Sequence, residues 1–107
     1  MKRLILTMAL FAGSAHAEFI SGNRLLSDLD SESSYGRGFA TGYIIGVVDR
    51  GYNVNHCIPA DATVKQVVDV VKRALVQMPQ VRHYTGDAIV YGVLQNTWPC
   101  AKKGGDV

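Results

Sequence analysis

The stretch from Thr63 to Pro79 carries a helix start signal, an apolar stripe and a helix stop signal. Thr63 and Gln66 have the spacing of a capping box, in which each side chain hydrogen-bonds a backbone N–H group at the start of a helix. The stretch contains apolar residues at helical spacing: Val64, Val67, Val68, Val71, Ala74, Leu75 and Met78. Valine also favours strands, but the strict alternation of a half-buried strand is absent. The pattern therefore predicts a helix over residues 64–78 with this apolar set as its buried face.

The first 17 residues have the three-part pattern of a secretory signal peptide. Lys2 and Arg3 precede an apolar run over residues 4–12, and small residues at A-x-A spacing end at Ala17. The apolar run is too short to span a bilayer. We expect cleavage after Ala17 and export of the mature chain; an N-terminal helix of a cytosolic protein is the alternative.

Cleavage of this peptide would leave the mature chain close to neutral. The full sequence of 107 residues has 11 basic and 9 acidic side chains, a formal charge of +2. Lys2 and Arg3 leave with the signal peptide, so the basic and acidic side chains become equal in number. Such a chain has no electrostatic support for nucleic-acid binding. No other segment is long and apolar enough to cross a membrane, so we expect a soluble product.

Two cysteines, Cys57 and Cys100, are the only ones in the sequence. Export would place them where disulfides persist, and a mature chain of about 90 residues is a small domain whose core needs such support. The alternatives are a reactive thiol and a metal pair with His56, but no C-x-x-C or H-x-x-x-H spacing is present. The sequence therefore predicts a disulfide between Cys57 and Cys100, and no metal site.

Three more helices are expected on either side of the first one. Ser21 is placed to cap a short N-terminal helix, and the polar cluster at residues 30–34 offers an N-cap for a helix over residues 35–52. A last helix is expected to start near residue 85, with Pro99 as its stop. The predicted fold is all-α, a small compact four-helix domain with one disulfide.

The expected domain organisation follows from these elements. Residues 1–17 form the signal peptide and residues 18–100 form the helical domain. Residues 101–107 follow the second cysteine and have the composition of a disordered tail.

The helix over residues 35–52 combines an apolar face with several glycines. Phe39, Tyr43 and Val47, with Ile44 and Val48, are expected to form the apolar face. Three glycines recur at intervals of four residues, and we call them the helix-contact ridge: Gly38, Gly42 and Gly46. Each costs about 1 kcal/mol relative to alanine, and small residues on one side of a helix let another helix approach closely. The ridge either packs within the chain's own core or contacts a subunit or partner.

The connection before the last helix is polar, aromatic and basic, and it is longer than two packed helices require. This 80–85 loop consists of Gln80, Val81, Arg82, His83, Tyr84 and Thr85. Exposed loops with arginine, histidine and tyrosine are common in recognition surfaces, because these side chains combine contact area with directional hydrogen bonds. A solvated connector is the alternative.

Catalytic chemistry has little support in the sequence. His56 and His83 lie in different segments, and no serine has the context of a nucleophile elbow. Carboxylates are dispersed, and the glycines do not form a phosphate-binding loop after a strand. We therefore expect no enzyme activity, no catalytic residue and no cofactor.

Short motifs follow one another through nearly the whole mature chain. They are Ser21-Gly22-Asn23-Arg24-Leu25-Leu26, Gly42-Tyr43-Ile44-Ile45-Gly46-Val47-Val48-Asp49, Cys57-Ile58-Pro59, the helix from Thr63, Pro79 with Arg82-His83, and Trp98-Pro99-Cys100. In this order and spacing, and behind a signal peptide, the sequence resembles the Rap/Tai family of periplasmic type VI secretion immunity proteins. Family members often have a further cysteine in the first helix, where this chain has Leu29. A second disulfide is therefore excluded here.

The resemblance implies a compact all-helical domain, often dimeric, that binds and blocks a peptidoglycan-cleaving amidase delivered by rival or sister cells. Its activity would be occlusion in the periplasm. We expect the 80–85 loop to be the effector-binding loop, with Arg82, His83 and Tyr84 as anchors in an amidase cleft with a Cys–His centre. The helix-contact ridge is then the candidate surface for a homodimer.

Two other functions stay open. An acid-activated periplasmic stress chaperone is also helical, exported and held by one disulfide, and would use protonation of carboxylates and of His56 or His83 to loosen a dimer. The nine carboxylates are few and dispersed for that role. The other alternative is a prophage-encoded inhibitor of a cell-wall hydrolase.

Overall fold

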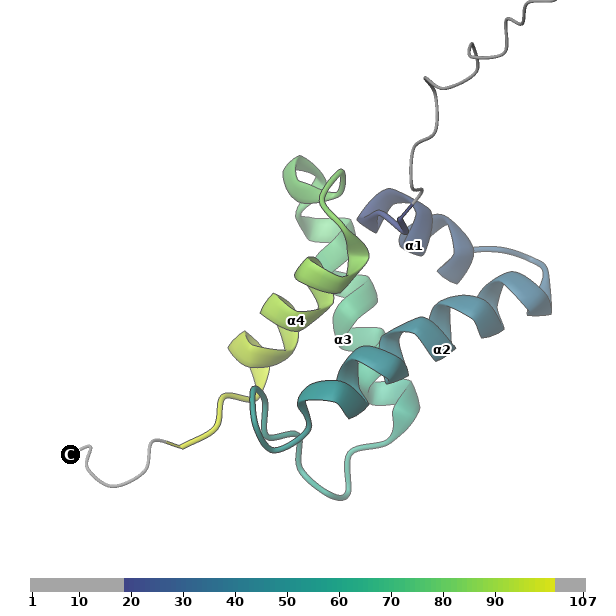
Figure 1. The fold of residues 1–107 in the computed structure, drawn as a ribbon. Helices are drawn as coiled ribbons and strands as arrows, with labels where there is room; N and C mark the ends of the chain where they lie inside the picture. The colour runs from purple at the N-terminus through teal and green to yellow at the C-terminus, as the bar shows by residue number, and fades with distance from the viewer. Residues whose placement is uncertain (1–18, 102–107) are drawn as a thin grey trace, which may run out of the picture.

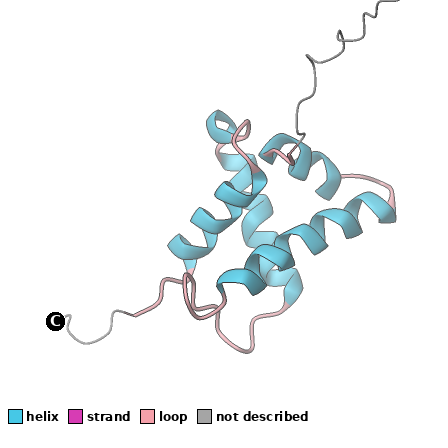
Figure 2. Ribbon diagram, viewed as in Figure 1, coloured by secondary structure: helices cyan, strands magenta, loops and turns pink. Residues whose placement is uncertain are grey.

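The computed structural model describes residues 19–101. The expected signal peptide and residues 102–107 of the expected tail lie outside the described residues. Four α-helices and one short 3₁₀ turn follow each other: α1 (Gly22–Leu29), α2 (Ser34–Gly51), α3 (Val64–Gln77), η2 (Pro79–Val81) and α4 (Gly86–Thr97). Figure 1 shows their arrangement, and Figure 2 shows helices and loops without a strand in the described part. The prediction of an all-α, four-helix fold is confirmed.

The helices pack around one apolar core to which all four contribute. Every pair of α-helices is in contact, and α2 crosses in front of α3 in the view of Figure 1. The core consists of the buried side chains Leu25, Leu29, Ala40, Ile44, Val47, Ile58, Val67, Val71, Leu75, Ile89, Val90, Val93 and Leu94. Full burial of one of the larger of these side chains stabilises the fold by about 1.5–3 kcal/mol.

Each α-helix begins at a serine or threonine that caps it. The side chains of Ser21, Ser33, Thr63 and Thr85 accept hydrogen bonds from backbone N–H groups in the first turns of α1 to α4, respectively. The predicted capping box is present: the Thr63 hydroxyl accepts from the Gln66 N–H at 3.0 Å, and the Thr63 N–H donates to Gln66 Oε1 at 2.7 Å. Caps of this kind stabilise a helix by about 1 kcal/mol each, which fixes where the helices start.

The predicted disulfide joins Cys57 and Cys100, whose Cα atoms lie 4.9 Å apart. It links the segment before α3 to the segment after α4, as the sequence indicates. A backbone hydrogen bond of 2.8 Å from the Cys57 N–H to the Trp98 carbonyl runs beside it. The end of α4 is therefore attached to the start of the α3 segment by covalent and hydrogen bonds.

The buried face of α3 agrees with the prediction except at its first residue. Val67, Val71 and Leu75 are buried, and Val68 packs against the core from its edge. Val64 is 53% exposed, so its assignment to the buried face is wrong. It lies in the first turn of α3 and lines an open hollow of about 480 Å³.

The predicted apolar face of α2 is partly wrong. Ile44 and Val47 are buried as expected, but Ala40 is also buried, whereas Phe39 is 38% exposed. The helix is therefore rotated about its axis relative to the expected face. The reason is that α2 carries apolar or glycine residues on every side, so its sequence period does not define one face.

The connection between α2 and α3 contains His56, whose burial the sequence did not predict. His56 is fully buried, and its Nε2 lies 3.0 Å from the Val48 carbonyl oxygen. A Cβ atom on Gly51 would lie 2.8 Å from His56 Cε1, so only glycine fits at the end of α2. Asn53 has a φ of 63°, a left-handed conformation that asparagine tolerates better than most residues. These features make the turn before Cys57 tight.

Candidate functional site

The 80–85 loop is a compact turn. It begins with η2 and continues through successive hydrogen bonds: the N–H groups of Val81, Arg82 and Tyr84 donate to the carbonyls of Met78, Pro79 and Val81, at 3.2, 3.3 and 3.0 Å. Each of these bonds spans three residues, so the backbone reverses direction within a short distance. The loop is therefore shaped by its own main chain.

The loop is also attached to the N-terminus of α1. The Asn23 N–H donates to the Arg82 carbonyl at 2.8 Å, and the Gly22 N–H donates to the Tyr84 carbonyl at 2.9 Å. The first N–H groups of a helix have no partner within the helix, so these bonds give a partner both to the helix N–H groups and to the loop carbonyls. A Cβ on Gly22 would lie 2.9 Å from the Arg82 carbonyl oxygen, so the close approach requires glycine.

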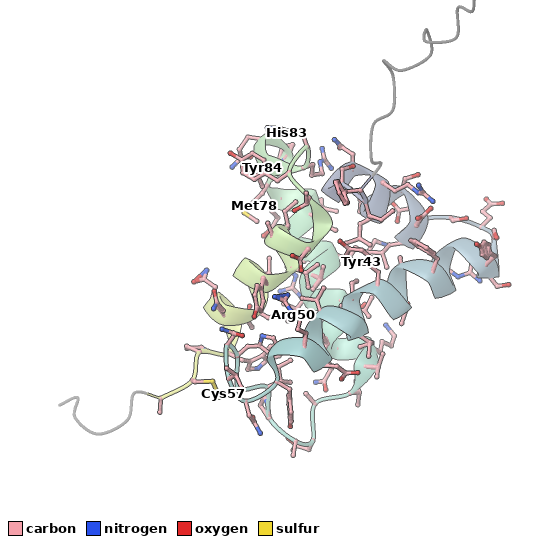
Figure 3. The ribbon with its side chains drawn as sticks, in the orientation of Figure 1. Tyr43, Arg50, Cys57, Met78, His83 and Tyr84 are labelled. Atoms are coloured by element: carbon pink, nitrogen blue, oxygen red, sulfur yellow. A yellow bond between two sulfur atoms is a disulfide. The ribbon has the colours of Figure 1, made fainter. Side chains whose placement is uncertain are left out.

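The loop side chains differ in how far they are exposed. Gln80, His83, Tyr84 and Thr85 are exposed, whereas Val81 and Arg82 are half-buried. The His83 and Tyr84 rings meet edge to face, with their centroids 4.5 Å apart, and Tyr84 is 52% exposed. Figure 3 shows this pair at the corner between α3 and α4, at the opposite end of the molecule from Cys57. The structure therefore brings two of the three expected anchors together as one aromatic projection.

Arg82 differs from the other two expected anchors. Its backbone is bound to α1, and its Nε atom is buried without a hydrogen-bond partner among the described residues. A buried unpaired donor costs about 1–3 kcal/mol, more for a charged group. Arg82 is therefore less exposed for contact than His83 and Tyr84.

A second hollow borders the other side of the loop. It has a volume of about 390 Å³ and lies between the N-terminal segment, α2 and the start of α4, with Phe19, Tyr43, Thr85 and Asp87 among its lining residues. Burial raises the pKa of Tyr43 above its ordinary value, the backbone N–H of Asp87 lowers it, and the Asp87 carboxylate raises it. The net effect is a raised pKa, so the Tyr43 hydroxyl, which is protonated at neutral pH in any case, stays protonated to a higher pH than that of a free tyrosine.

The helix-contact ridge faces away from the core. No other part of the described chain comes within 4 Å of the position that a Cβ would take on Gly38, Gly42 or Gly46. The first of the two interpretations, packing within the chain's own core, therefore does not hold in this fold. Tyr35 (74% exposed) and Phe39 lie on the same outer side of α2, and the Arg24 guanidinium lies 5.6 Å from the centre of the Phe39 ring. The outer side of α2 therefore presents an open row of glycines with exposed aromatic side chains beside it.

The two histidines that the sequence singled out have different environments. His56 is buried beside Val48, whereas His83 is exposed in the loop. Among residues 19–101 no group of three or more histidine, cysteine or acidic side chains has the arrangement of a metal site. None of the helices in that same range combines the length and apolar character that a membrane span requires.

The fold and the loop define a class of protein: a small all-helical domain, closed by a disulfide, that presents an exposed aromatic loop. The family model of the Rap1a immunity proteins matches residues 21–100. The chain therefore belongs to the Rap1a immunity protein family. The match extends from the N-cap of α1 to the second cysteine and includes the loop, the ridge and the disulfide. A search of curated proteins and a search of solved structures found no match.

Membership in this family confirms the resemblance at the level of an immunity protein. It indicates an immunity function exercised by binding an effector, and proteins of this kind are generally not enzymes. The link to type VI secretion, the amidase target and the homodimer stay predictions.

Proposed function

We propose that this chain is a periplasmic immunity protein that binds and occludes a peptidoglycan amidase effector delivered by type VI secretion. The observation that carries the proposal is the aromatic projection of His83 and Tyr84 on a loop that is hydrogen-bonded to α1. Family membership supplies the immunity role, and the projection supplies a means of blocking a cleft.

Occlusion requires a loop that keeps its shape. A flexible loop loses conformational entropy when it binds, and this loss weakens binding. The loop carbonyls of Arg82 and Tyr84 are already bonded to α1, so little ordering is left for the bound state. Aromatic side chains also supply large contact areas with few rotatable bonds, as binding hot spots do. The exposed rings would enter the amidase cleft and exclude the peptidoglycan stem peptide from its Cys–His centre.

The periplasmic location is supported by the sequence pattern of residues 1–17 and by the disulfide. A disulfide persists in an oxidising compartment, such as the bacterial periplasm. Peptidoglycan lies in the same compartment, so an inhibitor of a wall amidase acts where its disulfide is stable.

The test is an inhibition assay with purified proteins. The mature, oxidised chain is mixed with each of a panel of purified peptidoglycan amidases, and cleavage of purified peptidoglycan is measured. We expect one amidase to form a complex stable in size-exclusion chromatography and to lose its activity at a stoichiometric ratio. An amidase that is bound but stays fully active would contradict occlusion. No amidase partner, combined with suppression of client aggregation at acid pH alone, would favour the chaperone.

We also propose that the helix-contact ridge is the surface of a homodimer. An open glycine row lets two α2 helices approach closely, and a two-fold axis would pair the same surface on both copies. The exposed rings of Tyr35 and Phe39 would then be covered by the partner.

The substitution Gly42→Leu tests the ridge. It should convert the dimer to a monomer with unchanged helix content, because the leucine meets no neighbour within its own protomer but blocks the approach of a second helix. Light scattering coupled to size exclusion gives the mass, and circular dichroism gives the helix content. Gln95→Leu, at an exposed position of α4, is the matched control. A dimer that survives Gly42→Leu would show that the interface lies elsewhere.

A further inference from the structure

A small hollow lies between α4 and the corner that carries the 80–85 loop. Its volume is about 260 Å³, and its walls on the loop side are Met78, Val81 and Tyr84. Figure 3 shows Met78 and Tyr84 at the same end of the molecule, next to His83. We call it the α4 hollow. Two of its three wall residues, Val81 and Tyr84, belong to the 80–85 loop itself.

The floor of the α4 hollow is formed by α4. Ile89 and Val93 are nearly fully buried and line its base, and Ala88 and Gly92 form its open side. No charged side chain of the described chain lines it, and Asn96 is its polar residue at the far end of α4. The hollow therefore favours an uncharged, apolar occupant, because a charged group would lose hydration there without gaining a partner.

Gly92 keeps the hollow open. Apart from its own helix backbone, nothing in the described chain comes within 4 Å of the position that its Cβ would take, so a Cβ would point into open space there. Alanine would stabilise this exposed helical position by about 1 kcal/mol relative to glycine. The glycine therefore adds nothing to the stability of α4, but it preserves the depth of the hollow.

We infer that the α4 hollow is part of the effector-binding surface and receives an apolar, uncharged side chain that projects from the rim of the effector's cleft. This inference rests on the proposed function. The same effector is the occupant because the loop and the hollow share Val81 and Tyr84. A protein that packs against Tyr84 would also lie beside the hollow, because Tyr84 forms one of its walls. The aromatic projection then enters the effector, and the effector's side chain enters the α4 hollow.

The substitution Gly92→Leu tests the inference by filling the hollow from within. The probe is the purified amidase that forms a complex with the wild-type chain. We expect its affinity to fall by at least about tenfold, because an apolar side chain buried at the centre of an interface contributes strongly to binding. The thermal midpoint should not fall, because leucine is a better helix former than glycine and its Cβ meets no close neighbour. Gln95→Leu adds the same side chain outside the hollow and should leave affinity unchanged.

The outcomes separate this inference from the proposed function. His83→Ala changes the aromatic projection without touching the hollow. If His83→Ala weakens amidase binding but folded Gly92→Leu binds like the wild type, the hollow is not used and the proposed function stands. If Gly92→Leu changes the oligomeric mass in light scattering and not the amidase affinity, the occupant is a second copy and the inference is overturned. If no amidase binds the wild-type chain, the proposed function and the inference fail together.

Gly92→Ala, which adds one methyl group, repeats the comparison should the leucine variant not fold.

Discussion

Replacing Cys57 and Cys100 by serine should lower the free energy of unfolding by about 4 kcal/mol. The bond closes a loop with a sequence separation of 43 residues, and in the chain-entropy model its loss frees that loop in the unfolded state. Native domains are stable by only about 5–15 kcal/mol, so the loss is a large part of the total.

Urea unfolding followed by circular dichroism measures this loss. The wild-type chain in reducing buffer is the internal control, because it lacks the bond but keeps both side chains. The reduced wild type and the double serine variant should unfold at the same urea concentration, well below the oxidised wild type. Equal midpoints for oxidised and reduced protein would contradict the prediction, since the disulfide would then contribute nothing to stability.

The positions of the helices could be predicted from local signals. Ser21 and Thr63 cap helices where the sequence placed them, and α4 ends just before Pro99. The disulfide was also predictable, because two cysteines allow one pairing within the chain. These features depend on short-range rules of capping, proline geometry and covalent chemistry, which need no knowledge of the tertiary structure.

The direction in which side chains point was harder to predict. In α2 glycines and apolar residues occupy every side, so the choice between Phe39 and Ala40 for the core depends on where the other helices lie. The outward direction of the helix-contact ridge has the same origin. The direction of these side chains depends on how the helices pack together, and sequence periodicity does not contain that information.

The sequence indicated where the candidate site lies, but not its three-dimensional shape. The composition of the 80–85 loop indicated recognition, yet Arg82 is half-buried and its carbonyl accepts a hydrogen bond from α1, which lies some sixty residues earlier in the chain. The α4 hollow was missed because it needs Met78, Tyr84 and Gly92 to meet in space. A glycine in the exposed part of a predicted helix was the one available signal, and it is weak on its own.

The double substitution His83→Ala with Tyr84→Ala should weaken binding of the cognate amidase by at least about a hundredfold, because aromatic anchors at the centre of an interface typically contribute 2 kcal/mol or more each. The fold should survive. Both rings are exposed, and the bond from the Gly22 N–H is accepted by the backbone carbonyl of Tyr84, which alanine retains. Isothermal titration calorimetry measures the affinity, and peptidoglycan cleavage measures the return of amidase activity.

The matched control for this variant is Lys65→Ala, which shortens an exposed side chain on the first turns of α3, where its ion pair with Asp69 is open to solvent. Exposed pairs of this kind contribute little, so neither stability nor affinity should change measurably. Substituting the two aromatic residues one at a time then apportions the loss. Tyr84 should account for the larger share, since its ring both projects from the loop and forms a wall of the α4 hollow, whereas His83 contributes to the projection alone. Wild-type affinity in a folded double variant would mean that the amidase is held by another surface, and the exposed side of α2 would be the next to test.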